Sequence, residues 1–188
     1  MRISIIGIPG AGKTTLATLL GGMFKTMHIS SGELARAHGF AGSKAEKAGK
    51  LDPNENKIRT LVKSAIGGSD MYILDGFPRM IDQIEAVQLP LDAVIHLKAK
   101  LGIAADRLFD RGRPDDTPEV INARIATYFR HTYPLVEYFD DKDLLIEIDA
   151  NGSIAETMGK TVVQLSRKGV IEAKNMVDDL LSWEKKHD

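Results

Sequence analysis

The stretch Gly7-Ile8-Pro9-Gly10-Ala11-Gly12-Lys13-Thr14 decides the fold of this chain. It follows an apolar run at residues 3–6, which predicts a buried strand, and leads into residues 15–20, which predict a helix. The spacing is that of the P-loop, whose glycines let backbone N–H groups and a helix N-terminus converge on phosphate oxygens. A glycine-rich turn with an exposed lysine is the weaker interpretation in this context, so the sequence predicts binding of a nucleoside triphosphate.

Composition restricts the classes of protein to which the chain can belong. Its 188 residues fit one domain with a sheet covered on both sides, and its net charge of −1 gives no reason to expect nucleic acid or an acidic membrane as partner. The absence of cysteine excludes disulfides and a cysteine-ligated zinc site, so we expect no zinc. Strand residues begin at Arg2 and no apolar run reaches membrane-spanning length, so we expect no signal peptide and a cytoplasmic location.

Apolar runs alternate with helical segments along the chain. The runs lie at residues 3–6, 27–29, 71–74, 93–97 and 144–148. This alternation predicts an α/β fold with a five-stranded parallel sheet, helices on both faces and ligands at the carboxyl ends of the strands. Helix starts are indicated by capping patterns, namely Ser30-x-x-Glu33, Ser43-x-x-Glu46, Ser153-x-x-Glu156, Asp52-Pro53 and Thr117-Pro118.

A second motif, Asp75-Gly76-Phe77-Pro78-Arg79, closes the apolar run at residues 71–74. An aspartate at the end of a strand is commonly a helix cap or a turn residue. Downstream of a P-loop, however, a carboxylate at this point holds Mg²⁺ beside the P-loop hydroxyl, usually through water. The sequence therefore predicts a magnesium site formed by Thr14 and Asp75, with Arg79 near the bound anion.

Arginine replaces lysine in residues 101–141. This segment has five arginines and no lysine: Arg107, Arg111, Arg113, Arg124 and Arg130. A guanidinium group is planar and bidentate, so it fixes the orientation of a phosphate where a lysine would not. For Arg107 and Arg130, a salt-bridged surface with the nearby aspartates is an equally good interpretation. For the other three, phosphate contact is favoured.

These motifs together resemble adenylate kinase and related nucleoside monophosphate kinases. The segment from His28 to Arg36 is similar to the family's monophosphate-site opening, and Asp75–Arg79 with Gln83 is similar to its signature. Residues 113–124 resemble the lid hinge and the helix after it, and residues 151–153 resemble the loop near the ATP adenine. The similarity spans about residues 1–165.

The resemblance implies a reaction in which ATP and a nucleoside monophosphate give two diphosphates with Mg²⁺, with ATP, AMP and ADP as ligands and a monomer as the working form. It implies catalytic roles for Lys13, Arg79, Arg111, Arg113 and Arg124. It places ATP on Gly10, Ala11, Gly12, Lys13, Thr14, Thr15, Arg107, Arg111 and Gly152. It places AMP on Ser31, Arg36, Leu51, Asp52, Gly76, Phe77, Pro78, Arg79, Gln83, Arg113 and Arg124.

Three departures from the family pattern concern the domain boundaries and the fit of AMP. Only Gly112 separates Arg111 from Arg113, which predicts a very short lid at about residues 111–118. Within a small monophosphate-binding insertion at about residues 30–57, Asp52 stands where the family has an aliphatic residue. An extra C-terminal helix is expected at about residues 170–186, packed on the body or forming an oligomer contact.

Two alternative functions follow from the same motifs. The first is a kinase for CMP, UMP or GMP, against which Gln83 argues, because a side-chain amide can pair with both the donor and the acceptor of an adenine edge. The second is a non-catalytic ATP-binding switch or assembly factor. Such a protein should have lost the arginines for the second phosphate, whereas this chain has Arg36, Arg79, Arg113 and Arg124.

Overall fold

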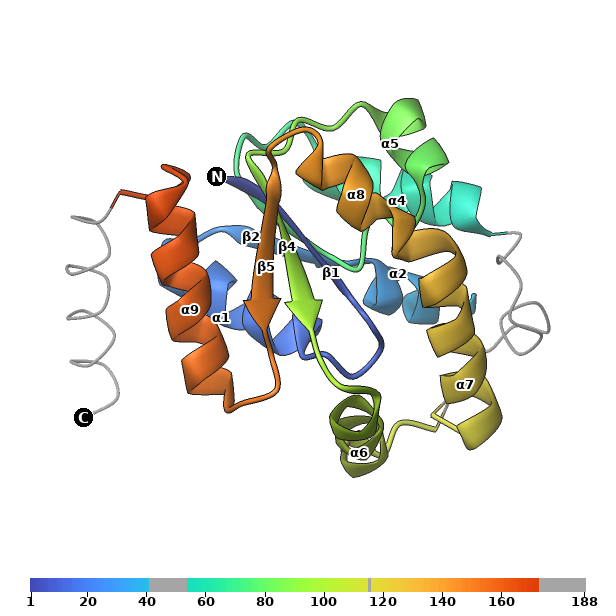
Figure 1. Ribbon diagram of the computed structural model, residues 1–188. Coiled ribbons are helices and arrows are strands. Elements are labelled where there is room, and N and C mark those ends of the chain that lie inside the picture. Colours follow the sequence, from blue (N-terminus) through green and yellow to red (C-terminus); the bar gives the residue numbers. More distant parts are fainter. Residues whose placement is uncertain (41–53, 115, 173–188) are drawn as a thin grey trace.

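Five parallel strands form the centre of the computed structural model, which describes residues 1–40, 54–114 and 116–172 (Figure 1). The strands β1 (Arg2–Gly7), β2 (Met27–Ser30), β3 (Tyr72–Asp75), β4 (Ala93–Lys98) and β5 (Leu145–Asp149) pair in the order β2-β3-β1-β4-β5. Every pairing is parallel. Each strand matches its predicted run to within one residue at either end, so the predicted sheet is confirmed.

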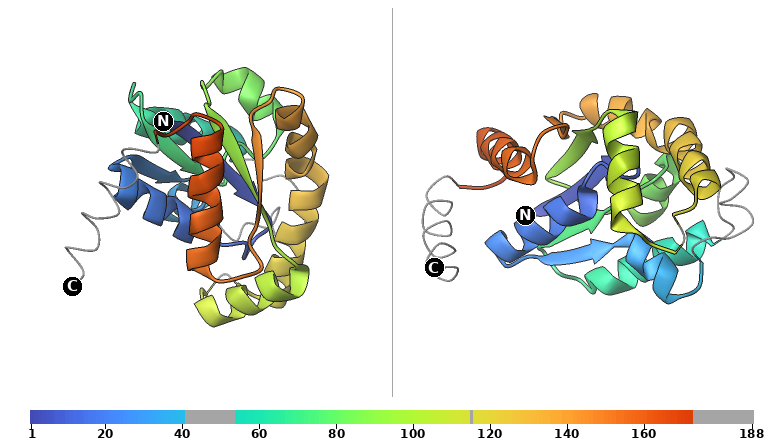
Figure 2. Two further views of the ribbon diagram at one scale, coloured as in Figure 1. Left: turned by 60° about the vertical axis from the view of Figure 1, so that its left-hand side comes forward. Right: turned by 90° about the horizontal axis from the view of Figure 1, so that it is seen from below.

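Helices cover both faces of this sheet, as predicted. Alternate side chains of β1 point to opposite faces, because the side-chain period of a strand is two: Ile5 lies in one apolar cluster and Ile6 in another. The helices α1 (Lys13–Phe24) and α9 (Ile154–Arg167) cover the first face. The helices α4 (Glu55–Ile66), α5 (Ile81–Val87) and α8 (Pro134–Asp140) lie on the other face (Figure 2).

Three predicted helix starts are confirmed by their hydrogen bonds. Ser30 caps α2 (Ser31–Ala37) by accepting a hydrogen bond from the backbone N–H of Glu33. Ser153 and Glu156 form a reciprocal capping box at α9, which satisfies two backbone donors at the helix start. Thr117 caps α7 (Pro118–Thr127), with Pro118 in the first turn. The patterns at Ser43 and Asp52 lie outside the described residues.

The carboxyl edge of the sheet is bordered by α6 (Leu101–Arg111), toward which β4 and β5 point in Figure 1. Helix α6 ends at Gly112, whose φ of 60° is left-handed and suits glycine. Helix α7 continues into a π-helical turn, η1 (Tyr128–Thr132), before α8. Most of the helix expected at about residues 170–186 lies outside the described residues. Within the part of the chain that the structure covers, no helix is both long and apolar enough to cross a membrane.

Candidate active site at the carboxyl edge of the sheet

A cavity of about 590 Å³ opens at the carboxyl edge of the sheet. The P-loop, α2, the β3–α5 loop, the α6–α7 segment and the β5–α9 loop all contribute to its walls. Segments far apart in the sequence therefore meet around one space. The predicted site residues that line it are Gly10, Ala11, Gly12, Lys13, Thr14, Thr15, Ser31, Arg36, Asp75, Gly76, Pro78, Arg79, Arg107, Arg111, Arg113, Arg124 and Gly152.

Four predicted AMP-site residues are placed differently or not described. The ring of Phe77 is buried in the apolar cluster between the sheet and α4, so only its backbone could face a ligand. Gln83 is 4% exposed and is not among the described residues that line the cavity. Leu51 and Asp52 lie outside the described residues. The structure thus brings most of the predicted residues together but holds Gln83 back from the surface of the cavity.

The P-loop is shaped by backbone that only glycine adopts readily. Gly10 and Gly12 have φ angles of 82° and 95°, and a Cβ on Gly10 would collide with the backbone carbonyl of Ala104. The loop turns Lys13 back on itself, so its Nζ donates to the carbonyl oxygens of Gly7 (2.8 Å) and Ile8 (2.9 Å). The cation is thereby held inside the loop, where an incoming phosphate can take over these bonds.

Lys13 has an unusual acidity. Burial lowers the pKa of its ammonium group to about 8, with the positive charges of Arg79 and Arg111 acting in the same direction and Asp75 opposing them. Among the described residues that line the cavity, Lys13 and six arginines outnumber the two carboxylates, Glu55 and Asp75. Such an arrangement favours a polyanion.

Thr14, at the start of α1, and Asp75, at the end of β3, lie in contact. The hydroxyl of Thr14 donates to Oδ2 of Asp75 over 2.6 Å. Burial acts to raise the pKa of Asp75, but the neighbouring His28 side chain, 3.7 Å away, and the charge of Lys13 hold it below its usual range. One hydroxyl and one ionised carboxylate fit Mg²⁺, which keeps several waters and takes few protein ligands. The described residues contain no group of three or more histidine or carboxylate side chains that could hold a metal ion.

The β3–α5 loop is fixed by hydrogen bonds to its backbone carbonyls. Ser31 donates to the carbonyl of Gly76 over 2.8 Å, and Nε of Arg79 donates to the same oxygen over 3.1 Å. Thr132, from η1, donates to the carbonyl of Arg79 over 3.0 Å. Two elements, α2 and η1, therefore hold the loop that carries Arg79, and Arg79 lines the cavity.

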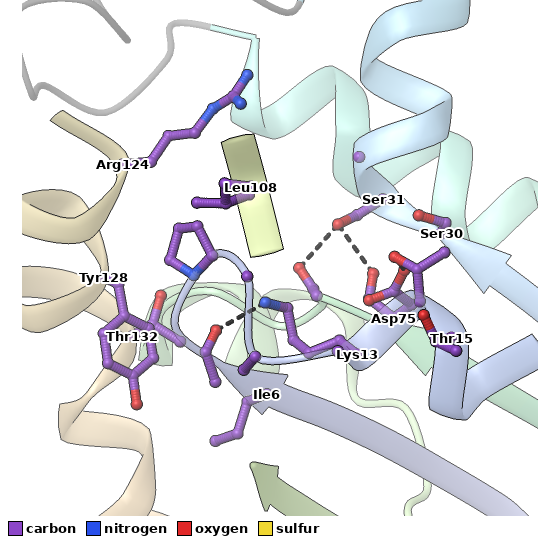
Figure 3. A pocket seen from close by; sticks show the side chains of 18 of the residues that line it. Ile6, Lys13, Thr15, Ser30, Ser31, Asp75, Leu108, Arg124, Tyr128 and Thr132 are labelled. Atoms are coloured by element: carbon purple, nitrogen blue, oxygen red, sulfur yellow. Dashed lines mark hydrogen bonds between the residues drawn. The ribbon is translucent and has the colours of Figure 1, made fainter. Parts of the chain in front are cut away.

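Two arginines that line the cavity, one at the end of α6 and one on α7, share one carboxylate. Nε and Nη2 of Arg111 bind Asp116, with its Oδ2 2.7 Å from Nη2, and Nη1 of Arg124 donates to Oδ1 of Asp116 over 2.9 Å. The Asp116 side chain is only 2% exposed, so this is a buried anion between two cations. Asp116 accepts hydrogen bonds from these guanidinium groups as a phosphate oxygen would. Figure 3 shows Arg124 across the P-loop from Lys13.

For Arg107 and Arg130 the sequence favoured phosphate contact and a surface ion pair equally. The structure places these two arginines differently. Arg107 donates to the backbone carbonyls of Ala150 and Gly152, both over 2.9 Å, and so holds the β5–α9 loop against α6. Within the described residues it forms none of the ion pairs that were one of its two interpretations, and it lines the cavity. Arg130 is exposed and is not among the described residues lining the cavity, which agrees with a surface role.

Sequence reasoning missed several residues of this site. Glu55, Tyr128 and Thr132 line the cavity but belong to no motif, so no spacing pattern could have indicated them. His28 was noted only as part of a motif. Its Nε2 is buried 3.7 Å from Oδ2 of Asp75 and forms no hydrogen bond with the described residues.

Comparison with known proteins agrees with this geometry. The sequence model of the family described as adenylate kinase matches residues 5–144. The chain is 35% identical over 184 residues to an adenylate kinase of Corynebacterium urealyticum, covering 89% of this chain and all of that protein. It is 38% identical over 173 residues to an adenylate kinase of Oenococcus oeni, covering 82% and 92% respectively. The P-loop and the arginines that line the same cavity agree with these similarities, and the chain belongs to the adenylate kinase family.

Proposed function

We propose that this chain transfers the γ-phosphoryl group of ATP to AMP, giving two ADP. The observation that carries the proposal is that one cavity joins the P-loop to a second set of cations, Arg36 and Arg79. A protein that only bound ATP would need no second phosphate site. Family membership supports the same reaction.

Each wall of the cavity has a separate task in this proposal. The P-loop amides and Lys13 hold the β- and γ-phosphates of ATP, while Ser31, Arg36 and Arg79 hold the phosphate end of AMP. Thr14 and Asp75, the latter through water, would hold Mg²⁺, which neutralises charge on the phosphates when bound.

Arg111, Arg113 and Arg124 face the space between the two nucleotides. Charge accumulates on the oxygens of the transferred group, and guanidinium donors already fixed by the fold stabilise it without reorganisation. Catalysis by this arrangement needs no general base, because alignment and charge neutralisation lower the barrier. In the structure, Asp116 holds two of these arginines, Arg111 and Arg124, and we infer that ATP replaces it. The short segment at about residues 111–118 would serve as the lid, and about residues 30–57 as the AMP-binding insertion.

A coupled assay tests the proposal. Wild-type protein with ATP and Mg²⁺ should form ADP fastest with AMP, and more slowly with GMP, CMP or UMP. Chelation of the metal with EDTA should remove most of the activity. Faster turnover of CMP or UMP would assign the acceptor site to a pyrimidine, and the absence of turnover with all four would favour a non-catalytic ATP-binding protein.

A further inference from the structure

Glu55 connects Arg79, which the proposed function assigns to the phosphate of AMP, with Gln83, which the sequence assigns to the adenine. Its Oε2 accepts a hydrogen bond from Nε2 of Gln83 over 2.8 Å, and its Oε1 lies 3.6 Å from Nη1 of Arg79. Arg79 would bind the phosphate and Gln83 the base. The Glu55 carboxylate, at the start of α4, thus contacts both the Arg79 guanidinium group and the Gln83 amide at once.

Burial shows which of these groups a ligand meets first. Glu55 lines the cavity, with 14% of its side chain exposed, whereas Gln83 is 4% exposed and lies behind it. The Gln83 amide is also held from its other side, because its Oε1 accepts a hydrogen bond from the backbone N–H of Arg79 over 2.7 Å. Glu55 therefore separates Gln83 from the space in which an acceptor would bind.

Charge makes this arrangement competitive. The phosphate of AMP is an anion, and an anion bound at Arg79 repels a carboxylate that lies 3.6 Å from the same guanidinium group. Glu55 and the AMP phosphate cannot both use Arg79 without that repulsion. Displacement of Glu55 also frees Nε2 of Gln83, which can then donate to an acceptor atom on the base.

We propose that Glu55 determines the affinity and selectivity of the acceptor site by competing with the acceptor for Arg79 and Gln83. This inference rests on the proposed function. A ligand enters when it supplies an anion for Arg79 and a hydrogen-bond acceptor for Gln83 in place of the carboxylate. AMP supplies both, whereas adenosine lacks the anion and leaves Glu55 paired with Arg79.

Two substitutions separate the contributions of charge and reach. Glu55→Gln keeps an oxygen for Gln83 but loses the negative charge at Arg79. Glu55→Asp keeps the charge on a side chain that is one methylene shorter. Glu85→Gln, on the exposed surface of α5, makes the same charge change away from the cavity and is the matched control. Calorimetry of each nucleotide-free protein with AMP, adenosine and ATP gives dissociation constants that do not depend on turnover.

Loss of one charged competitor should tighten AMP binding by about tenfold in Glu55→Gln, the usual scale of a charged hydrogen bond. Glu55→Asp should tighten it by a smaller factor, and ATP affinity should stay within about twofold in both. Adenosine affinity should change less than AMP affinity. Unchanged or weaker AMP binding in both variants would overturn the competition and make Glu55 a residue that positions Arg79. If wild type forms ADP from AMP while these constants do not move, only this inference fails; if wild type forms no ADP, the proposed function fails.

Discussion

The cavity has two sets of cations: Lys13 on the P-loop wall, and Arg79, Arg111 and Arg124 on what we name the arginine wall. The two walls hold their cations in different ways. On the P-loop wall, Lys13 donates to carbonyl oxygens of its own loop, five and six residues away in sequence. On the arginine wall, Arg111 and Arg124 both bind Asp116, and Arg79 lies near Glu55. The first wall is preorganised by local backbone, and the second by carboxylates that stand where phosphates would bind.

This difference indicates which wall should respond to ligand. Backbone carbonyls carry only partial charge, so Lys13 retains most of its attraction for phosphate. A carboxylate carries a full charge and must be displaced from an arginine before a phosphate can use that arginine fully. We therefore expect substitutions on the P-loop wall to affect chemistry, and substitutions of the carboxylates to affect affinity and stability.

The largest expected effect is the loss of the P-loop cation. Lys13→Met should reduce turnover about a hundredfold or more, because a fixed donor to the developing charge is removed. A coupled assay at saturating ATP and AMP measures this. Lys63→Met, an exposed change on α4, is the control and should retain normal activity. Near-normal turnover in Lys13→Met would mean that the loop serves the fold alone.

On the arginine wall, geometry should matter as much as charge. Arg113→Lys and Arg124→Lys keep the charge but lose the planar fork, so each should lower turnover by about tenfold or more. The exposed Arg130→Lys is the matched control and should be nearly silent. Equal and mild effects at all three positions would place these arginines in surface ion pairs rather than at the transferred group.

The same contrast explains how far the sequence predicted this site. The P-loop was predictable because Gly10, Gly12 and Lys13 act through local backbone geometry, which fixed spacing encodes. The sheet was predictable because each strand is an apolar run between helical segments. The pairing of Glu55 with Gln83, 28 residues apart, depends on the packing of α4 against α5 and has no local signature. Likewise, Asp106, Asp110, Asp115 and Asp116 were all possible partners of the arginines from the sequence, and only the fold shows that Asp116 binds Arg111 and Arg124.

Asp116 offers a test at the level of stability. Asp116→Asn should destabilise the nucleotide-free protein by about 1–3 kcal/mol, since a buried carboxylate that neutralises two arginines is lost. ATP should restore part of this loss, so its stabilising shift in Tm should be larger in the variant than in wild type. Asp110→Asn, exposed on α6, controls for net charge. Equal ATP-induced shifts in both proteins would show that phosphate does not replace Asp116.

The smallest expected effect concerns the pH dependence of stability. Lys13 has a pKa of about 8 in the folded protein, against 10.5 ordinarily, and burial is the main cause. Below pH 8 the ammonium group is charged in both states, and the penalty for burying it is fully present. Between about pH 8 and 10.5 the unfolded chain binds more protons than the folded one, so stability should rise with pH through this range.

Comparison with Lys13→Met isolates this contribution from other groups that titrate at high pH. Because Lys13 is partly exposed, we expect a discounted change of about 1–2 kcal/mol in the stability difference between the two proteins. Urea unfolding of both proteins without nucleotide at pH 7 and pH 10 measures it, with wild type gaining relative to the variant at the higher pH. Lys13→Arg stays charged throughout and should show no such gain over Lys13→Met. A difference that is independent of pH would mean that the loop carbonyls of Gly7 and Ile8 fully compensate the buried charge.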